Sequence, residues 1–127
     1  MEDRMSMEEA LQKAKPFVER ALDKGTGAFE WSDIVREVLL GNMLLWFGKE
    51  SCLVTQFIEH PRKKSLHIIL GAGDLDEIKR MVDGSIVPFA KINDCDDMTL
   101  VGRKGWKKVF NDIGWNEKHV TLYRGLK

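Results

Sequence analysis

The stretch Leu66–Asn93 constrains the fold of this 127-residue chain more than any other part of it. It begins with a short apolar run, Leu66–Leu70, continues through Gly71-Ala72-Gly73, and becomes amphipathic from Asp74 onward. An apolar run, a glycine-rich turn and a helix start together predict a strand–turn–helix unit. Such a unit directs backbone N–H groups toward the helix start, where an anion can bind.

A long helix is predicted after this turn, because apolar residues recur at intervals of three and four. Those residues are Leu75, Ile78, Val82, Ile86 and Phe89. Gly84 and Pro88 predict a bend within the helix, which closes at the polar residues around Asn93. The segment 97–102 follows as a strand. Because a helix connects it to the strand at 66–70, the two strands are expected to be parallel, with a right-handed crossover.

The remaining elements complete one α+β domain over residues 1–127. Residues 1–42 read as helical: Ser6 and Glu9 form a capping box, Pro16 should kink or split the first helix, and Ser32 is a candidate cap for a second. From residue 43, strands at 43–47, 51–59 and 66–70 form an antiparallel meander. A short basic helix over 103–110 and a final strand over 119–126 end the chain. The predicted architecture is a mixed, mostly antiparallel sheet with helices on both faces.

The charge balance argues against a dedicated nucleic-acid binder, because 20 basic residues match 20 acidic ones. The distribution is uneven, however. Residues 72–98 hold seven acids and three bases, a net charge of −4, whereas residues 103–127 hold seven bases and two acids, a net charge of +5. Three interpretations stay open: solvated helix faces of opposite sign, an electrostatic seam between segments, or a basic surface for an acidic partner.

Several classes of site are not indicated by the sequence. Cys52 and Cys95 have no metal-ligand spacing, and neither do the three histidines, so no metal site is predicted. The charged N-terminus, Met-Glu-Asp-Arg, has no apolar core of a secretory signal, and no apolar run approaches the ~20 residues of a membrane span. Together these features predict a cytoplasmic protein without membrane contact.

The residues from Leu100 to Trp115 carry a resemblance to a known family. Leu100-Val101-Gly102-Arg103-Lys104-Gly105-Trp106, followed by Ile113-Gly114-Trp115, is similar to a stretch in small proteins of tailed phages that are related to the Gcn5-related N-acetyltransferases (GNAT). Ser51–Gln56, after Leu45-Trp46, also resembles those proteins. The resemblance implies a reduced GNAT-like fold, a bacterial host cytoplasm or a virion as location, and acetyl-CoA as cofactor.

The resemblance implies where acetyl-CoA would bind. The family's Gln/Arg-x-x-Gly-x-Gly/Ala motif aligns with Gly71 and Gly73, so the implied cofactor contacts are Gly71, Ala72, Gly73, Asp74 and Leu75. Ile68 departs from the motif at its Gln/Arg position, and the acidic residues that start the helix would repel a pyrophosphate. The two glycines are equally what a tight turn requires.

Catalytic residues are poorly indicated. The helix over 105–112 lacks the tyrosine that active members carry there, and Tyr123, the only tyrosine, falls on the predicted last strand. Glu59 and Glu50 are conceivable general bases, although neither has a sequence signature, and Tyr123 is the other catalytic candidate. The alternative is an inactive GNAT-fold binding module: a virion or assembly component, or an inhibitor of a host protein. Its binding residues would be Arg103, Lys104, Lys107 and Lys108. Self-association through an edge strand or the N-terminal helices is a third possibility.

Overall fold

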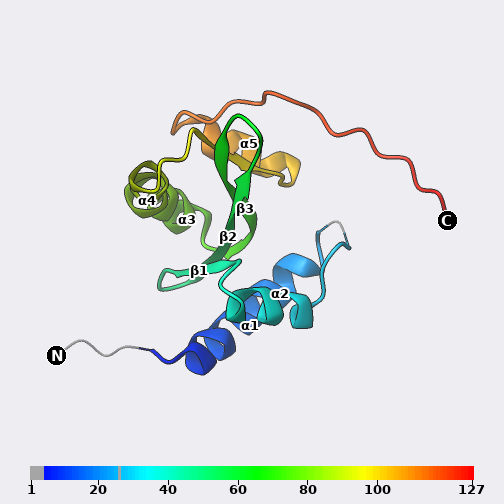
Figure 1. Ribbon diagram of the computed structural model, residues 1–127. Coiled ribbons are helices and arrows are strands. Elements are labelled where there is room, and N and C mark those ends of the chain that lie inside the picture. Colours follow the sequence, from blue (N-terminus) through cyan, green and yellow to red (C-terminus); the bar gives the residue numbers. More distant parts are fainter. Residues whose placement is uncertain (1–4, 26) are drawn as a thin grey trace.

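The computed structural model describes residues 5–25 and 27–127 (Figure 1). The charged residues 1–4, on which the expectation of no secretory signal rests, lie outside this range. The elements in chain order are α1 (Met7–Leu22), α2 (Trp31–Leu39), β1 (Leu44–Phe47), β2 (Ser51–Glu59), β3 (Lys64–Gly73), α3 (Leu75–Met81), a π-helical segment η1 (Val82–Ile86), α4 (Val87–Ile92), β4 (Asp97–Leu100) and α5 (Lys104–Asn111).

The four strands form one mixed sheet in the order β1-β2-β3-β4. β1 and β2 are antiparallel, as are β2 and β3, whereas β3 and β4 are parallel. The predicted meander and the predicted helical crossover between β3 and β4 are therefore confirmed. The fold class, an α+β domain with helices on both faces of a mostly antiparallel sheet, is confirmed as well.

Each face of the sheet has its own hydrophobic core, because successive side chains of a strand point to opposite faces. On one face, Cys52 and Val54 of β2 pack with α1 and α2, where Ala14, Val18 and Ile34 are fully buried. On the other face, Leu53 joins a cluster supplied by β3, α3, η1, α4 and α5. The buried members of this second cluster are Leu53, Leu66, Ile68, Ile78, Val82, Ile86, Ala90, Trp106 and Phe110.

The N-terminal helices differ from the sequence-based expectation in two details. Ser6 accepts a hydrogen bond from the Glu9 N–H at 3.1 Å, as a capping residue should. Helix α1 continues through Pro16, so the alternative of two helices is wrong; Pro16 is exposed, and water can satisfy the carbonyl it leaves unpaired. Helix α2 begins at Trp31, before the expected cap Ser32, because the Asp33 carboxylate accepts the Glu30 N–H at 2.8 Å.

Strand β3 is longer than predicted, and Gly71-Ala72-Gly73 belongs to it rather than to a turn. Gly73 pairs with Ser51 and Ala72 with Cys52, so β2 holds the strand until Asp74 caps α3. The expected bend in the following helix takes the form of η1, which contains Gly84 and is followed by Pro88 near the start of α4. A π-helical turn is a common way to insert one residue into a helix.

The predicted last strand over 119–126 is wrong. Residues 115–127 have no regular secondary structure, and they leave the body as an extended arm (Figure 1). Val120, Leu122 and Tyr123 are 72%, 90% and 90% exposed. The alternation of side chains records a tendency to form a strand, but a strand forms only beside another strand, and among the described residues the arm lies beside none. Among the described residues, no helix is long and apolar enough to cross a membrane.

A carboxylate from α3 holds the turn between β1 and β2. Glu77 accepts the backbone N–H groups of Lys49 at 2.8 Å and of Glu50 at 2.9 Å. Gly48 lies directly beneath this carboxylate, where a side chain would collide with it. The Ser51 hydroxyl, together with the two N–H groups, holds the pKa of Glu77 below its ordinary value. The ionised form of Glu77 therefore stabilises the fold.

We expect Glu77→Gln to lower the melting temperature at pH 7 and to remove part of the acid sensitivity of the fold. Because folding lowers the pKa, the contribution of Glu77 is fully present above about pH 4.3, the unfolded value, and is lost as the pH falls through the lower folded value. Thermal unfolding between pH 3 and pH 7 measures this. Asp76→Asn, an exposed neighbour in the same helical turn, is the matched control, and equal pH profiles for the two variants would contradict the assignment.

Candidate functional site

The sheet opens at a β-bulge in the middle of β3. Val54 pairs with Leu70 and Thr55 with Ile68, so Ile69 is an extra residue that has no partner on β2. The pairing between β3 and β4 ends at the same point, with Ile68 opposite Leu100. Beyond this point β3 continues to Gly73, whereas the chain after β4 turns away through Val101–Arg103 into α5. The two strands therefore splay apart at their carboxyl ends.

The splay leaves backbone groups of β3 unpaired on the side that β4 vacates. The Ser51 backbone carbonyl accepts the Gly48 N–H, so the main-chain groups of Ser51 face β1. The Glu50 backbone carbonyl accepts the Asp74 N–H, so the main-chain groups of Glu50 face β3. Along β2 this alternation turns Cys52 and Val54 toward β3. The backbone N–H and C=O groups of their partners, Ala72 and Leu70, therefore bond to β2. Gly71, between them, directs its N–H and C=O into the splay.

A pocket of about 240 Å³ occupies the splay. Its walls come from the end of α1, from β3 around the bulge, from the chain after β4, and from α5. The lining residues are Ala21, Lys24, Gly25, Ile68, Ile69, Leu70, Gly71, Leu100, Val101, Gly102, Arg103 and Trp106. The pocket thus combines an apolar interior with two cationic side chains, Lys24 and Arg103.

Trp106 forms one side of this pocket, and two glycines make room for it. A Cβ at Gly71 would lie 3.0 Å from the Trp106 ring and would collide with Leu53, and one at Gly102 would lie 3.3 Å from Trp106. The ring is 9% exposed and stacks on Phe110 with centroids 5.4 Å apart. Gly71 and Gly102 are therefore required by packing around the pocket.

The start of α3 is closed to an anion by its own cap. The Asp74 carboxylate accepts the N–H groups of Asp76 at 2.9 Å and of Glu77 at 3.3 Å. Asp74 is also the only residue between β3 and α3, so no loop is present there to wrap a pyrophosphate. Of the five expected cofactor contacts, Gly71 lines the pocket and the other four, Ala72–Leu75, do not. Their assignment as contacts stays a prediction.

The candidate catalytic residues lie away from the splay. Glu59 ends β2 opposite Lys64, seven residues before Gly71 along β3, which corresponds to roughly 20 Å. Glu50 lies in the turn between β1 and β2, where its carbonyl accepts the Asp74 N–H at 3.2 Å. Tyr123 lies on the projecting arm and is 90% exposed. The structure brings none of the three to the pocket.

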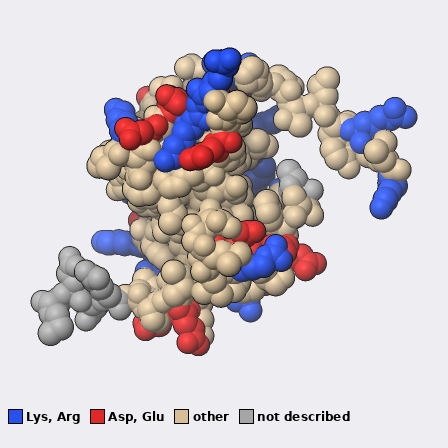
Figure 2. All heavy atoms as spheres, viewed as in Figure 1, with Lys and Arg blue, Asp and Glu red and all other residues tan. Residues whose placement is uncertain are grey.

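The four expected partner-binding residues are divided between the pocket and the helix surface. Arg103 lines the pocket, whereas Lys104, Lys107 and Lys108 are exposed on α5, where Lys107 lies 3.6 Å from Glu117. Figure 2 shows basic and acidic side chains interspersed over the visible face of the body, with basic ones at the tip of the arm. On that face the surface is therefore of mixed charge.

Thiols and imidazoles supply no further chemistry near the splay. Burial raises the pKa of Cys52 to about 12, and burial also raises the pKa of Cys95, so neither thiol is an activated nucleophile at neutral pH. His67 bridges to the Thr99 hydroxyl at 2.8 Å, and its partial burial lowers its pKa. Within residues 5–25 and 27–127, no cluster of three potential metal ligands occurs.

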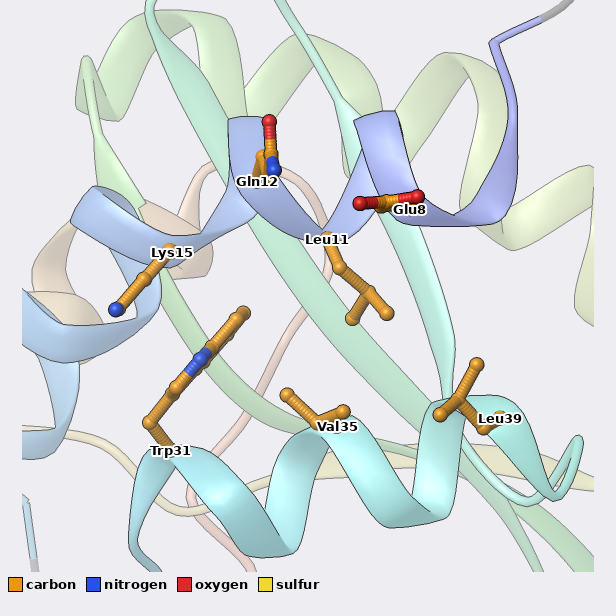
Figure 3. Close-up of a pocket in the computed structure, with 7 residues that line it drawn as sticks. All are labelled: Glu8, Leu11, Gln12, Lys15, Trp31, Val35 and Leu39. Atoms are coloured by element: carbon orange, nitrogen blue, oxygen red, sulfur yellow. The ribbon is translucent and has the colours of Figure 1, made fainter.

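A second hollow lies between α1 and α2, remote from the splay (Figure 3). Leu11 projects into it from α1, and Trp31, Val35 and Leu39 project from α2. Its volume is about 360 Å³, and its remaining walls are the polar side chains Glu8, Gln12 and Lys15. This groove is therefore lined by side chains of both α1 and α2.

Comparison with solved structures identifies the fold. The chain is similar to an aminoglycoside acetyltransferase from an uncultured soil metagenomic sample in complex with sisomicin (TM-score 0.66, 14% identity, covering 98% of this chain and 95% of that chain). It is also similar to a predicted acetyltransferase with acetyl-CoA from Clostridium acetobutylicum (TM-score 0.64, 12% identity, 95% and 92% covered). A third is glucosamine-6-phosphate N-acetyltransferase from Arabidopsis thaliana (TM-score 0.62, 10% identity, 98% and 97% covered).

These similarities extend over nearly the whole chain, and the protein has a GNAT-like fold. No model of a known protein family matches the sequence, and no curated protein matches it either. At identities of 10–14%, the shared property is the fold.

Sequence reasoning missed most of the pocket. Lys24 and Gly25 line the pocket, although they precede the bulge residue Ile69 by 45 and 44 residues in the sequence. Nothing in their local sequence indicates a binding site. The bulge itself had a weak signal, since Ile68, Ile69 and Leu70 are three consecutive apolar residues where strict alternation would place a polar one. Arg103 and Gly71 are the pocket residues that the sequence had indicated as candidate binding residues.

Gly73 has a structural role that a substitution can measure. Its φ is +124°, and a Cβ there would lie 2.6 Å from the Ser51 Cα and would collide with the Glu50 carbonyl. We expect Gly73→Ala to destabilise the protein by about 2 kcal/mol or more in chemical denaturation. Gly84→Ala is the matched control, because no atom lies within 4 Å of the Cβ it would add. Equal stability of the two variants would refute this role.

Proposed function

We propose that this protein binds an acyl-CoA in the splay between β3 and β4 and acts as an N-acetyltransferase on an amine substrate. One observation carries the proposal: a pocket formed at the bulge of β3, with the Gly71 N–H directed into it, within a fold whose solved neighbours include acetyltransferases. A volume of about 240 Å³ suits the acyl thioester and the adjoining arm rather than a complete cofactor.

The phosphate end of an acyl-CoA fits one side of the site and not the other. Asp74 occupies the N–H groups at the start of α3, and Asp76 and Glu77 add negative charge there. Lys24 and Arg103 instead line the pocket, and Arg103 directly precedes α5, whose first turn carries Lys104 and no acidic residue. Phosphates are therefore assigned to the side of Lys24 and Arg103, where charge-assisted hydrogen bonds are available.

The chemistry available to this chain is positioning and carbonyl polarisation. The cofactor supplies an acyl group activated as a thioester. The Gly71 N–H donates a hydrogen bond to the thioester oxygen, on which negative charge develops when an amine attacks the carbonyl carbon. The C–N bond forms, the C–S bond breaks, and the proton released by the amine neutralises the departing thiolate. The packed walls around Trp106 hold the thioester in place for this attack.

Calorimetry with two ligands tests the proposal. We expect both acetyl-CoA and the short thioester S-acetyl-N-acetylcysteamine to bind. Arg103→Glu should weaken acetyl-CoA about tenfold or more, since a charge-assisted hydrogen bond contributes about 1.5–3 kcal/mol, and it should leave the short thioester unaffected. Lys108→Glu, on the same helix but outside the pocket, is the control and should change neither. Absence of binding by the folded protein at millimolar acetyl-CoA would overturn the proposal.

The second candidate function is a GNAT-fold binding module without catalysis. Two observations favour it: Asp74 caps the helix that would otherwise receive a pyrophosphate, and α5 contains no tyrosine to protonate a thiolate. The similarity of Leu100–Trp115 to small phage proteins supports a virion or assembly component, or an inhibitor of a host protein, located in the bacterial cytoplasm or the virion. Its partner-binding surface would be Lys104, Lys107 and Lys108, with Arg103 at the edge.

Charge reversal tests this surface. We expect replacing Lys104, Lys107 and Lys108 by Glu to abolish capture of an acidic protein partner from bacterial lysate, because the interaction depends on three exposed cations on α5. The control carries the same three reversals at Lys49, Arg62 and Lys91, which are exposed elsewhere. If the first variant retains every captured protein, α5 is not the interface.

A further inference from the structure

The hollow between α1 and α2, called the α1–α2 groove below, is a surface that the proposed function does not use. Its volume is about 360 Å³, and its apolar walls are Leu11, Trp31, Val35 and Leu39. Leu39 is 61% exposed, so part of this apolar wall faces water in the single chain. Apolar surface exposed in a groove with a polar rim indicates a contact surface for another element.

The groove has a charged residue at each end and an apolar residue opposite each charge. α1 and α2 run antiparallel, so Glu8 lies across from Leu39, and Lys15 lies across from Trp31 (Figure 3). Glu8 and Lys15 are seven residues apart in the sequence, or about 10 Å along α1. Trp31 and Leu39 are eight residues apart, or about 12 Å along α2. The charged pair and the apolar pair therefore have nearly the same spacing.

This pattern is complementary to itself. A two-fold axis that crosses both helices at the middle of the groove brings one groove against another with the helices antiparallel. Each Glu8 then faces Lys15 of the second copy. Each Trp31 ring likewise faces Leu39 of the second copy and covers its exposed side chain. Every contact is formed twice, because a two-fold interface uses the same patch on both copies.

The charges also select this arrangement over the other two-fold arrangement of the same surface. With the axis parallel to the helices, Glu8 would face Glu8 and Lys15 would face Lys15, and like charges that face each other across an interface are unfavourable. Glu8 and Lys15 are the charged residues among those that line the groove, and both are exposed. The ion pairs formed among the described residues include neither of them.

We propose that two copies of this chain associate through their α1–α2 grooves, with α1 antiparallel to α1 and α2 antiparallel to α2 across a two-fold axis. The 16 residues of α1 are about 24 Å long, and two adjacent helices are about 20 Å wide. A contact of this size is at the lower end of specific interfaces, so the dimer is weak and depends on concentration.

Sedimentation equilibrium of the full chain from about 5 to about 500 µM tests the dimer. We expect reversible dimerisation. Glu8→Lys and Lys15→Glu should each raise the dissociation constant about tenfold or more, because each substitution makes both charge pairs repulsive. An equimolar mixture of the two variants should dimerise again, because every facing pair then joins a lysine to a glutamate. Lys91→Glu, at an exposed position on α4, is the control and should dimerise like the unaltered chain.

An apolar substitution provides a second test on the other helix. Leu39→Asp should abolish dimerisation and leave the melting temperature of the monomer unchanged, because the side chain is mostly exposed there. Leu40→Asp, at a neighbouring position that is 66% exposed and does not line the groove, should stay dimeric. A full chain that is monomeric throughout the concentration range contradicts the proposal. So does a mixture of the two charge variants that stays monomeric, or equal dimerisation of Leu39→Asp and Leu40→Asp.

Crosslinking near the two-fold axis locates the contact. Gln12 lines the groove and lies within one residue of the midpoint between Glu8 and Lys15. In a Cys95→Ser background, Gln12→Cys places one accessible thiol on each side of the axis. We expect a short bis-maleimide reagent to join two copies through this residue, whereas Lys91→Cys in the same background should give no joined species. A dimer that is not joined through Gln12→Cys associates through another surface, and the proposal is then wrong.

Discussion

The register shift at Ile69 is the constraint on which the rest of the molecule depends. Before the shift, β3 is paired along both edges; after it, only β2 holds the strand. Because β4 loses its partner at Leu100, the chain turns away, and α5 starts where it can place Trp106 against Gly71. One extra residue in one strand therefore creates the opening, its walls and the free backbone group at its centre.

Two helices, α3 and α5, begin at the open end of the sheet, and the charges at their N-termini are opposite. α3 has an acidic cap whose oxygens already accept its first N–H groups, with two more acids in its first turn. α5 is preceded by Arg103, makes no side-chain cap bond, and carries a lysine in its first position. The electrostatic asymmetry of the open end is thus built by the residues at two helix starts, and it favours an anion only near α5.

The sequence predicted the strand order, the parallel crossover with its helix, the two N-terminal helices and the short basic helix, because these depend on local periodicity and short turns. It placed the end of β3 too early, since Gly71 and Gly73 were interpreted as a turn. Glycine is required at 71 because Trp106 lies close to it, and at 73 because the Glu50 carbonyl does. Both neighbours are distant in the sequence. The last strand failed for a related reason: alternation over 119–126 records a tendency to pair but not the partner. For the site, Gly71 and Arg103 were accessible from motifs, whereas Lys24 reaches the pocket only through the packing of α1 on the sheet.

The π-helical segment η1 has a consequence for how the crossover connection can vary. Ile78, Val82, Ile86 and Ala90 are all buried at a spacing of four, although an uninterrupted α-helix advances by about 100° per residue. Over twelve residues a regular helix would turn Ala90 roughly 120° away from Ile78. The wider turn of η1 absorbs that drift and keeps one continuous stripe on the sheet. Loss of a single residue near Gly84 would restore regular hydrogen bonding and yet rotate α4, and with it the loop that delivers β4 to the sheet. The length of this connection is therefore fixed to the residue.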